Sequence, residues 1–256
     1  MLAELVEYLL TPSPPLARRL GYLKEAVAIR ARARRCRAAW AGHLARCRTA
    51  VLEAARSSPG RGLAQVLGSG ALLDIPVEEL SAMFDQVVLA DLVHPLAARL
   101  RVRNLRNVSL RTIDLTGVLA EVDRGRLPGR VPVDLHAGLE TDLPDLTVSA
   151  NIMSQLPLLP VKRLAATGLY RPEELKVVAR GLLEEHLALL ERMPGVVCLI
   201  TDTAWRDGDS VQDPLQGITL PEPTETWTWN IAPRPEAHPD RDVTHEVAAF
   251  IRKARF

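Results

Sequence analysis

From Gly62 onward, short apolar runs alternate with longer stretches of helical character, and this alternation limits the fold more than any other feature. Such alternation is typical of parallel β-sheets whose connections are helices. The runs that read as strands are Leu63–Leu67, Val87–Asp91, Val108–Asp114, Leu146–Asn151, Val196–Asp202, Thr226–Ala232 and Val247–Ile251. The stretches that read as helices are Pro76–Phe84, Pro95–Arg103, Thr116–Val122, Leu158–Thr167 and Pro172–Arg192.

The last two runs break this alternation. No helical stretch separates Thr226–Ala232 from Val247–Ile251, so we expect them to close the sheet as an antiparallel hairpin. The sequence therefore predicts an α/β fold. Its core would be a seven-stranded, mostly parallel sheet with helices on both faces and a C-terminal antiparallel hairpin.

The first part of the chain has a different composition. Alanine, leucine and arginine, which are strong helix formers, dominate residues 2–56, and the proline-rich TPSPP at 11–15 separates a first short helix from the rest. SSPGRG at 57–62 marks the end of this part. We expect residues 1–58 to form an N-terminal helical segment, acting as a lid or lying on the substrate side, and residues 59–256 to form the α/β domain.

Eight arginines lie between Arg30 and Arg56 against one acid, Glu53, although the net charge of the whole chain is only +1. A basic helix of this kind can bind RNA phosphates. The arginines are nevertheless spread around the helix. A solvated face, with some arginines paired to carboxylates of the main domain, is therefore preferred over nucleic-acid binding.

Four residues of the same region, Cys36, Trp40, His43 and Cys47, share one face of a continuous helix at this spacing. A buried packing stripe is the preferred interpretation. A metal site is disfavoured, because only His43 and Cys47 could reach the same ion and two ligands do not complete a site. A third possibility places Trp40 and His43 at the mouth of the active site.

The chain contains no apolar run of about 18 residues, so we expect no membrane span. Three cysteines without a framework spacing favour reduced thiols and a cytoplasmic protein. The oligomeric state stays open, with a homodimer as one option.

Glycines and acids follow the first three predicted strands. The first strand leads into Gly68-Ser69-Gly70, the second ends in Asp91 and the third in Asp114. Ligands of open α/β sheets bind outside the carboxyl ends of the strands. An acid after the second strand is placed to accept ribose hydroxyls, and Asp114 could accept a hydrogen bond from an exocyclic amine. These residues predict a nucleotide-like ligand.

In this order, VLGSGALLDIP, VVLADLVHP, VSLRTIDL and DLTVSANIMSQLP resemble the successive motifs of class I S-adenosylmethionine-dependent methyltransferases, over residues 60–256. The resemblance implies a Rossmann-like domain with S-adenosyl-L-methionine as cofactor and no metal. It implies the following positions for the cofactor-binding residues: Gly68, Ser69 and Gly70 around the methionine part, Asp91 at the ribose, Asp114 and Leu115 at the adenine, and Asn151 at the methyl-transfer centre.

The chain departs from the family pattern at two positions. Val66 stands where members usually carry an acid, and Leu72 stands where they usually carry a third glycine. These departures weaken the expected contact with the cofactor's amino group, for which Asp74, a few residues further on, is an alternative partner. They also favour the alternative that the protein is a non-catalytic, methyltransferase-like binding protein.

Methyl transfer depends mainly on alignment of the reacting groups, and a general base is needed only when the acceptor must lose a proton. Beside Asn151, the candidates for catalytic residues are Gln155 after the fourth strand and Asp202 after the fifth. The long segments Asp123–Asp145, which carries His136, and Arg206–Thr224 are candidates for loops that shape the acceptor pocket.

The predicted function is methyl transfer from S-adenosylmethionine to a small-molecule acceptor. Three other functions remain open beside it. They are a non-catalytic binding protein, an RNA methyltransferase, and transfer of the aminocarboxypropyl group of the same cofactor, as in nicotianamine-synthase-like enzymes.

Overall fold

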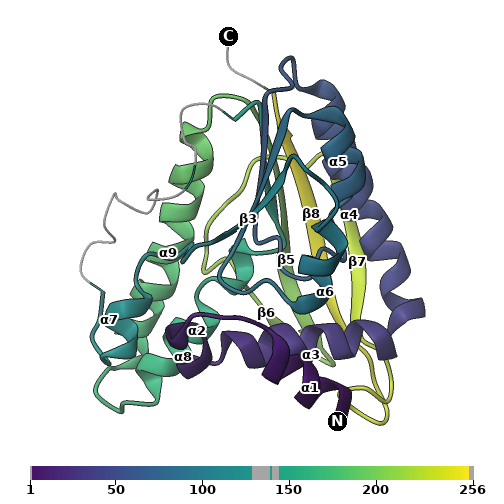
Figure 1. Ribbon diagram of the computed structural model, residues 1–256. Helices are drawn as coiled ribbons and strands as arrows, with labels where there is room; N and C mark the ends of the chain where they lie inside the picture. Colours follow the sequence, from purple (N-terminus) through teal and green to yellow (C-terminus); the bar gives the residue numbers. More distant parts are fainter. Residues whose placement is uncertain (1, 129–138, 140–143, 254–256) are drawn as a thin grey trace.

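The computed structural model describes residues 2–128, 139 and 144–253, and one mixed β-sheet forms the centre of this part of the chain (Figure 1). The strand order is β3-β2-β1-β4-β5-β8-β7, and a short strand, β6, pairs with β5 at the side. The strands are β1 (Leu63–Leu67), β2 (Gln86–Asp91), β3 (Val108–Thr112), β4 (Leu146–Ala150), β5 (Val196–Asp207), β6 (Ser210–Gln212), β7 (Glu225–Ala232) and β8 (Val243–Arg252).

The first five of these strands form the parallel part of the sheet. β1 pairs in parallel with β2 and β4, β2 with β3, and β4 with β5. β8 is antiparallel to β5, and β7 is antiparallel to β8. The predicted α/β fold with a parallel sheet and a C-terminal antiparallel pair is therefore confirmed. The chain reverses its direction of strand addition between β1 and β4, which is where ligands bind in open α/β sheets.

Helices cover both faces of the sheet (Figure 1). α4 and α5 lie along one face, α9 lies along the other, and α1, α2 and α3 cross one end of the sheet. The helices are α1 (Leu2–Leu10), α2 (Pro15–Arg19), α3 (Tyr22–Arg35), α4 (Arg37–Ser57), α5 (Val77–Met83), α6 (Leu96–Val102), α7 (Leu119–Asp123), the 3₁₀ helix η1 (Met153–Gln155), α8 (Leu158–Ala165) and α9 (Pro172–Arg192).

α3 and α4 are two helices and not one. The chain leaves helical geometry at Cys36, with φ −97° and ψ 23°, and α3 crosses the end of the sheet whereas α4 runs along its face (Figure 1). The expectation that one continuous helix carries Cys36, Trp40, His43 and Cys47 is therefore wrong, although all four side chains are buried, as expected of a packing stripe. No proline marks the bend, and Cys36 itself is buried at 5% exposure.

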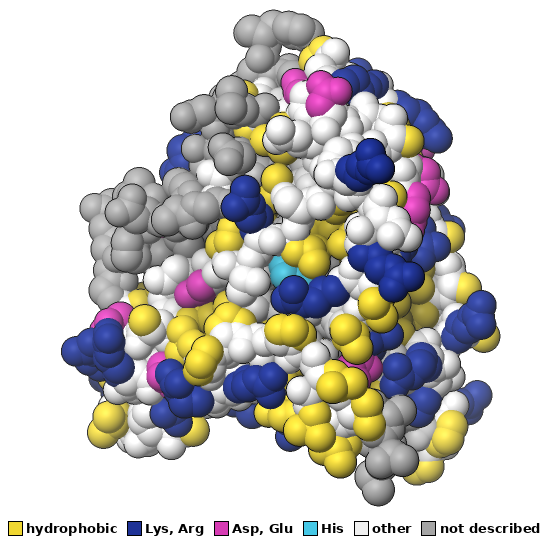
Figure 2. Space-filling model, viewed as in Figure 1, with side chains coloured by type: hydrophobic (Ala, Val, Ile, Leu, Met, Phe, Trp, Pro, Cys, Tyr) yellow, Lys and Arg dark blue, Asp and Glu magenta, His cyan; other side chains and the backbone are white. Residues whose placement is uncertain are grey.

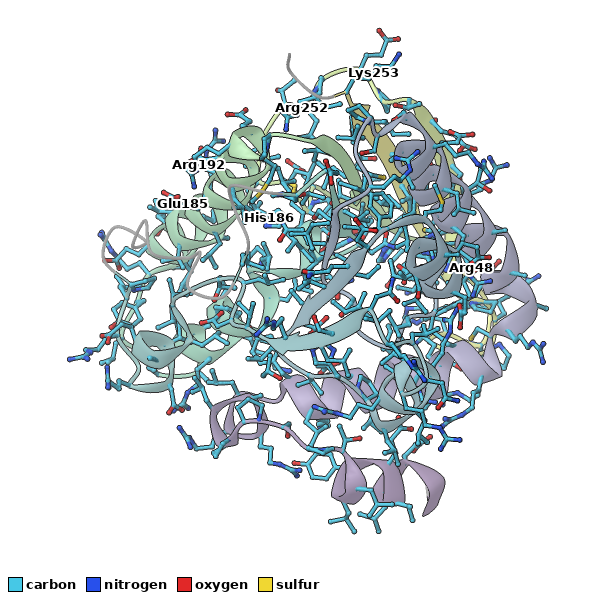
Figure 3. All side chains as sticks on the ribbon, turned by 45° about the horizontal axis from the view of Figure 1, so that its top comes forward. Arg48, Glu185, His186, Arg192, Arg252 and Lys253 are labelled. Atoms are coloured by element: carbon cyan, nitrogen blue, oxygen red, sulfur yellow. The ribbon has the colours of Figure 1, made fainter. Side chains whose placement is uncertain are left out.

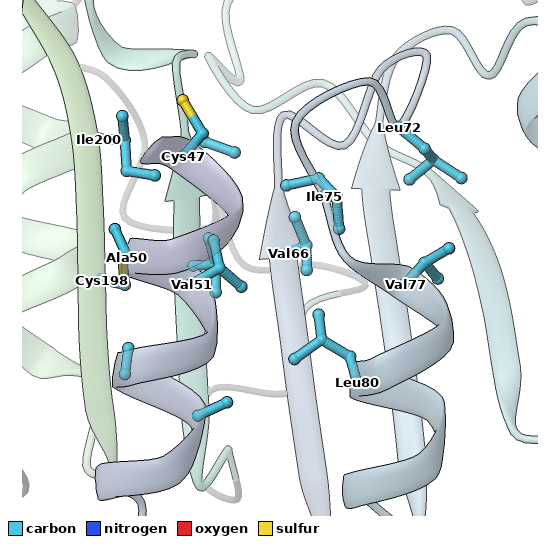
Figure 4. Packing of buried hydrophobic residues seen from close by; sticks show 14 of the residues in the cluster. Cys47, Ala50, Val51, Val66, Leu72, Ile75, Val77, Leu80, Cys198 and Ile200 are labelled. Carbon is cyan, nitrogen blue, oxygen red and sulfur yellow. The ribbon is translucent and has the colours of Figure 1, made fainter. Parts of the chain in front are cut away.

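α4 contributes its apolar stripe to the main hydrophobic core. Cys47 and Ala50 of α4 lie beside the β5 side chains Ile200 and Cys198, and Val51 belongs to the same cluster (Figure 4). Burying a valine or isoleucine side chain stabilises a protein by roughly 1.5–3 kcal/mol. This helix therefore belongs to the core of the α/β fold, although its sequence precedes the first strand.

The opposite face of the sheet is covered by α9. His186 of α9 points inward, where its Nε2 lies 2.8 Å from the hydroxyl of Ser149 on β4, while the neighbouring Glu185 points away (Figure 3). At the far end of this helix, the Arg252 guanidinium donates to the carbonyl oxygens of Leu190 and Met193 at 3.0 and 2.7 Å. These bonds satisfy carbonyl groups that a helix terminus leaves unpaired.

Two features of the antiparallel part differ from the expected elements. β5 does not end at Asp202 but continues to Asp207, and the strand β6 adds a small hairpin to it. The residues after Asp202 within β5 are Thr203, Ala204, Trp205, Arg206 and Asp207, so no continuous apolar run announces this part of the strand. In the described part of the chain, no helix has the length and apolar character that crossing a membrane requires.

Candidate active site

A cavity of about 470 Å³ opens at the carboxyl ends of the parallel strands. Its walls come from the loops after β1, β2, β3 and β4, and from α3, α4, α8 and β7. All seven residues expected to bind the cofactor line it, and so does Gln155. These residues are Gly68, Ser69, Gly70, Asp91, Asp114, Leu115 and Asn151. The strand-end motifs therefore meet at one cavity, as the sequence predicted.

The glycine turn after β1 is held against its neighbours on two sides. The N–H of Gly68 donates to the carbonyl of Ala90 on β2 at 2.9 Å, with φ of Gly68 at 78°. A Cβ atom at Gly68 would lie 2.4 Å from the Cβ of Ile152, in the loop after β4. Only glycine fits both this backbone conformation and this close approach. The Ser69 hydroxyl beside it is buried and has no hydrogen-bond partner among the described residues.

Leu72 follows the turn with φ 58°, in the left-handed region that glycine adopts most easily. The backbone thus has the conformation that the family's usual third glycine would allow, although the residue is a leucine. Its side chain is 1% exposed and belongs to the core beneath the turn, near Val66, Ile75 and Val77 (Figure 4). Leu72 therefore combines a left-handed backbone conformation with a side chain that is packed in the core.

The carboxylate of Asp91 connects the second strand to this turn. Its Oδ2 accepts a hydrogen bond from the N–H of Gly70 at 2.7 Å, and its Oδ1 accepts one from the N–H of Val93 at 3.2 Å. Each carboxylate oxygen has about two acceptor sites, so one on each stays available to a ligand. Burial raises the pKa of Asp91, whereas nearby His94 opposes this shift.

Asp114 accepts hydrogen bonds from the turn that follows its own strand, β3. Its Oδ1 accepts from the N–H and the hydroxyl of Thr116, at 2.9 and 2.6 Å, and its Oδ2 accepts from the N–H of Leu119 at 3.0 Å. These bonds order the turn that leads from β3 into α7 and hold Leu115 at the cavity wall. A contact of Asp114 with an exocyclic amine stays a prediction.

Asn151 lies directly after β4 in a left-handed conformation, with φ 51°. Its Nδ2 donates to Oδ2 of Asp74 at 2.7 Å, and its Oδ1 is buried without a hydrogen-bond partner among the described residues. Nε2 of Gln155, one turn further along, donates to the main-chain carbonyl of Asn151 at 2.6 Å. Asn151 and Gln155 therefore stand together at the cavity, and Asp74 joins them.

Asp202, the third expected catalytic residue, is not among the residues that line the cavity. It lies within β5 and is 3% exposed. Its Oδ2 accepts from the hydroxyl of Ser154 at 3.1 Å and from Nε1 of Trp205 at 2.8 Å, and it contacts Nδ1 of His245 at 3.1 Å. Asp202 thus supports the η1 turn that carries Gln155, one layer behind the cavity.

The N-terminal helices contribute a wall that the motifs did not reveal. Tyr22, Glu25 and Ile29 line the cavity from α3. Burial raises the pKa of Tyr22, and the neighbouring carboxylates Asp114 and Asp91 add to the effect. Sequence spacing alone does not select these three residues, because their position depends on how α3 packs across the sheet. A role of residues 1–58 as a lid or on the substrate side stays a prediction.

Aromatic side chains from α4 and β7 form another part of the wall. The His43 ring stacks on Trp229, with centroids 3.9 Å apart and 6° between the planes, and Trp40 meets Trp229 edge-on at 4.8 Å. Nε1 of Trp227 donates to Nδ1 of His43 at 3.1 Å, while burial lowers the pKa of His43 to about 4. The stripe from Trp40 to Cys47 is therefore both packed and part of the cavity wall.

Several of the N-terminal arginines form ion pairs. Arg30 and Arg34 pair with Glu7 of α1, Arg35 pairs with Glu236, and Arg46 pairs with Glu225 of β7. On the face shown in Figure 2, lysine and arginine side chains are dispersed and not gathered into one patch. These pairs fit the expected solvated face better than a surface built for polyanions.

Part of one predicted pocket loop, and one predicted histidine, lie outside the described residues. Residues 129–138 and 140–143 of the segment Asp123–Asp145, including His136, lie outside the described residues. Between the described residues, Cys47 Sγ lies 3.5 Å from Nε2 of His43, and no group of three or more possible metal ligands occurs in that part of the chain.

No family model matches the chain, and no curated protein matches it. Solved structures are similar to it over most of their length. Among them are the N-methyltransferase NodS of Bradyrhizobium japonicum WM9 with S-adenosylhomocysteine (14% identity, 80% of this chain and 84% of that chain, TM-score 0.39), the complex of DhpI with SAH (16%, 90% and 96%, 0.39), and a 1,6-didemethyltoxoflavin-N1-methyltransferase of Burkholderia thailandensis (14%, 91% and 90%, 0.35). Because these TM-scores are below 0.5, the fold assignment rests on the strand order itself.

Proposed function

We propose that the protein is an S-adenosyl-L-methionine-dependent methyltransferase that acts on a small-molecule acceptor. One observation carries the proposal. The glycine turn after β1 and the acid after β2 form a single hydrogen-bonded unit at the wall of a cavity at the sheet's switch point, through the bond from Gly70 to Asp91.

The residues present fit a nucleoside ligand. Asp91 keeps a free acceptor site on each oxygen for the two ribose hydroxyls, after its bonds to Gly70 and Val93. Leu115 and Ile113 offer an apolar wall at the end of β3, which suits an adenine ring. Ser69 and Asn151 each bring a buried polar atom without a partner among the described residues. A bound ligand would satisfy such atoms, whose burial is otherwise costly.

Asn151 and Gln155 are the proposed residues beside the methyl acceptor. S-adenosylmethionine supplies a methyl group on a sulfonium sulfur. For such a reaction the chain has to hold the acceptor in line with that methyl group and exclude water. The bond from Gln155 to the Asn151 carbonyl fixes the loop after β4, and α3 covers the cavity from the other end of the chain.

The acceptor half of the cavity is assigned to its aromatic side. The binding unit for the nucleoside lies on the β1 and β2 side of the switch point, whereas Trp40, His43 and Trp229 come from α4 and β7. A volume of about 470 Å³ is within the range of small-molecule sites. This division supports a small organic acceptor beside the cofactor.

Calorimetry with S-adenosylhomocysteine and S-adenosylmethionine tests the proposal. We expect saturable binding of both with micromolar dissociation constants, and formation of S-adenosylhomocysteine when an acceptor is present. Release of methylthioadenosine instead would indicate transfer of the aminocarboxypropyl group. Absence of binding at millimolar ligand would rule out every function that uses this cofactor.

A further inference from the structure

The cavity wall contains more acids than bases. Four carboxylates line it, on Glu25, Asp74, Asp91 and Asp114, while Lys162 is the one lysine or arginine among the described lining residues. An excess of one sign of charge in a low-dielectric cleft attracts a ligand of the opposite sign. The cavity is therefore suited to a ligand that carries positive charge.

Two of these carboxylates order loops, and a third is exposed. Both oxygens of Asp91 and both oxygens of Asp114 accept hydrogen bonds from main-chain N–H groups, which order the loops after β2 and β3. Glu25 is exposed on α3. Asp74 differs from them, because the side-chain group that holds it is the neutral amide of Asn151.

The pair of Asp74 and Asn151 leaves one acceptor, Oδ1 of Asn151, without a donor among the described residues. The Asn151 amide gives its N–H to Oδ2 of Asp74, so its own Oδ1 faces away from that carboxylate and has no partner among the described residues. Burial raises the pKa of Asp74, with the Asn151 bond and the charge of Arg48 opposing the shift. A buried carboxylate is stabilised when a cation with hydrogen-bond donors approaches it.

The pair also stands between the two halves of the cavity. Nδ2 of Asn151 lies 3.5 Å from Sγ of Cys47, one turn along α4 from His43 of the aromatic wall. Asp74 itself follows the glycine turn by four residues. Asn151 is therefore close to α4, the helix that carries His43 of the aromatic wall.

We propose that Asp74, held in place by Asn151, binds an amino group of the ligand within this cavity. The inference rests on the proposed function for the identity of the ligands. An ammonium ion provides three donors and a full charge, which match the Asp74 carboxylate and the unpaired Oδ1 of Asn151. The amino group can belong to the acceptor or to the amino-acid end of the cofactor, and binding measurements distinguish the two sources.

The experiment compares ligands that differ only in the amino group. Calorimetry measures the affinities of S-adenosylhomocysteine and its deaminated analogue, and ligand-observed NMR measures those of benzylamine and benzyl alcohol. Each ligand is tested with the wild type, with Asp74→Asn and with Glu25→Gln, a matched control on the same cavity. In the wild type, we expect the amine in one of these two ligand pairs to bind at least tenfold more tightly than the matching ligand without the amino group.

In Asp74→Asn this preference should disappear, whereas Glu25→Gln should keep it. Loss in the S-adenosylhomocysteine pair assigns the site to the cofactor, and loss in the benzylamine pair assigns it to the acceptor. An amine preference that persists in Asp74→Asn, or the absence of any preference in the wild type, would overturn the inference. Wild type that binds no S-adenosylhomocysteine but does prefer benzylamine contradicts the proposed function alone.

A second variant covers the case in which Asp74→Asn does not fold. Asn151→Gly keeps a residue that tolerates φ 51° and removes the amide that holds Asp74. We expect it to lose the amine preference at least threefold. An unchanged preference in this folded variant would also overturn the inference.

Discussion

The carboxylate of Asp91 accepts a hydrogen bond from the main-chain N–H of Gly70 at 2.7 Å, which joins the acid after the second strand to the glycine turn after the first. Two motifs that lie 21 residues apart in sequence thus form one structural unit. Their positions cannot change independently, because the turn is also bonded to Ala90, the residue before Asp91.

Asp91→Asn should weaken S-adenosylhomocysteine binding about 10- to 150-fold, since removing one partner of a charged hydrogen bond costs about 1.5–3 kcal/mol. Calorimetry measures the change. Asp85→Asn is the matched control, because Asp85 is exposed and does not line the cavity, and its affinity should equal that of the wild type. Equal affinities for all three proteins would exclude Asp91 from the ribose site.

Leu72→Gly should destabilise the fold by about 2–4 kcal/mol, although glycine suits φ 58° better. Relief of left-handed strain contributes about 1–2 kcal/mol. Removing a buried leucine costs more, because truncation to alanine alone costs about 2–5 kcal/mol. Urea unfolding gives the difference in the free energy of unfolding.

Gln216→Gly is the control for this prediction, since Gln216 has φ 52° but is not part of the core. Its free energy of unfolding should stay within about 1 kcal/mol of the wild type. If Leu72→Gly were as stable as Gln216→Gly, the packing of Leu72 would not hold the turn.

Stability should fall between pH 6.5 and about 4, in part because of His186. Burial lowers the pKa of His186 from 6.5 to about 4, so the unfolded chain binds more protons than the folded one in this range. The stabilisation is complete above pH 6.5 and is lost as the pH falls toward 4. A tenfold difference in proton affinity between the folded and unfolded chain corresponds to about 1.4 kcal/mol.

His186→Gln replaces the titrating ring and should flatten this pH dependence, whatever its stability at pH 7.5. Urea unfolding at pH 7.5 and pH 5.0 compares the loss in each protein. His238→Gln serves as control, because His238 is a partly exposed surface residue paired with Asp207. A loss of equal size in wild type and His186→Gln would refute the assignment.

The protein should not bind single-stranded RNA with a dissociation constant below about 100 µM at 150 mM KCl. Non-specific nucleic-acid binding needs several lysines or arginines that are available to phosphates. Here Arg30, Arg34, Arg35 and Arg46 pair with glutamates. Fluorescence anisotropy with a labelled 20-mer measures the affinity, and low-micromolar binding that weakens with salt would revive the RNA methyltransferase alternative.

The apolar runs were sufficient to predict most of the sheet. β1 (Leu63–Leu67) and α9 (Pro172–Arg192) have the bounds that the sequence indicated, because each is a run of consistent pattern with proline or glycine nearby. β5 extends past its apolar run. Its last residues pair with β8 and β6, and they do not need apolar side chains on both faces of the sheet.

The site was predictable where it depends on strand ends and not where it depends on tertiary packing. Glycines and acids after successive strands must meet at one edge of a parallel sheet. By contrast, the position of Tyr22 over the cavity depends on the bend at Cys36, which no proline or glycine announces. Asp202 was expected at a strand end, but its strand continues, and so its carboxylate lies behind the cavity.

The conformation of Leu72 also affects whether this chain is found by a search with a glycine-rich sequence motif. A motif records residue types and not backbone conformation, and here a leucine has the left-handed φ that glycine adopts most easily. The strain at this position is offset by the apolar contacts of the side chain. A search pattern that demands glycine at this position therefore passes over a chain in which a packed leucine has a left-handed backbone conformation.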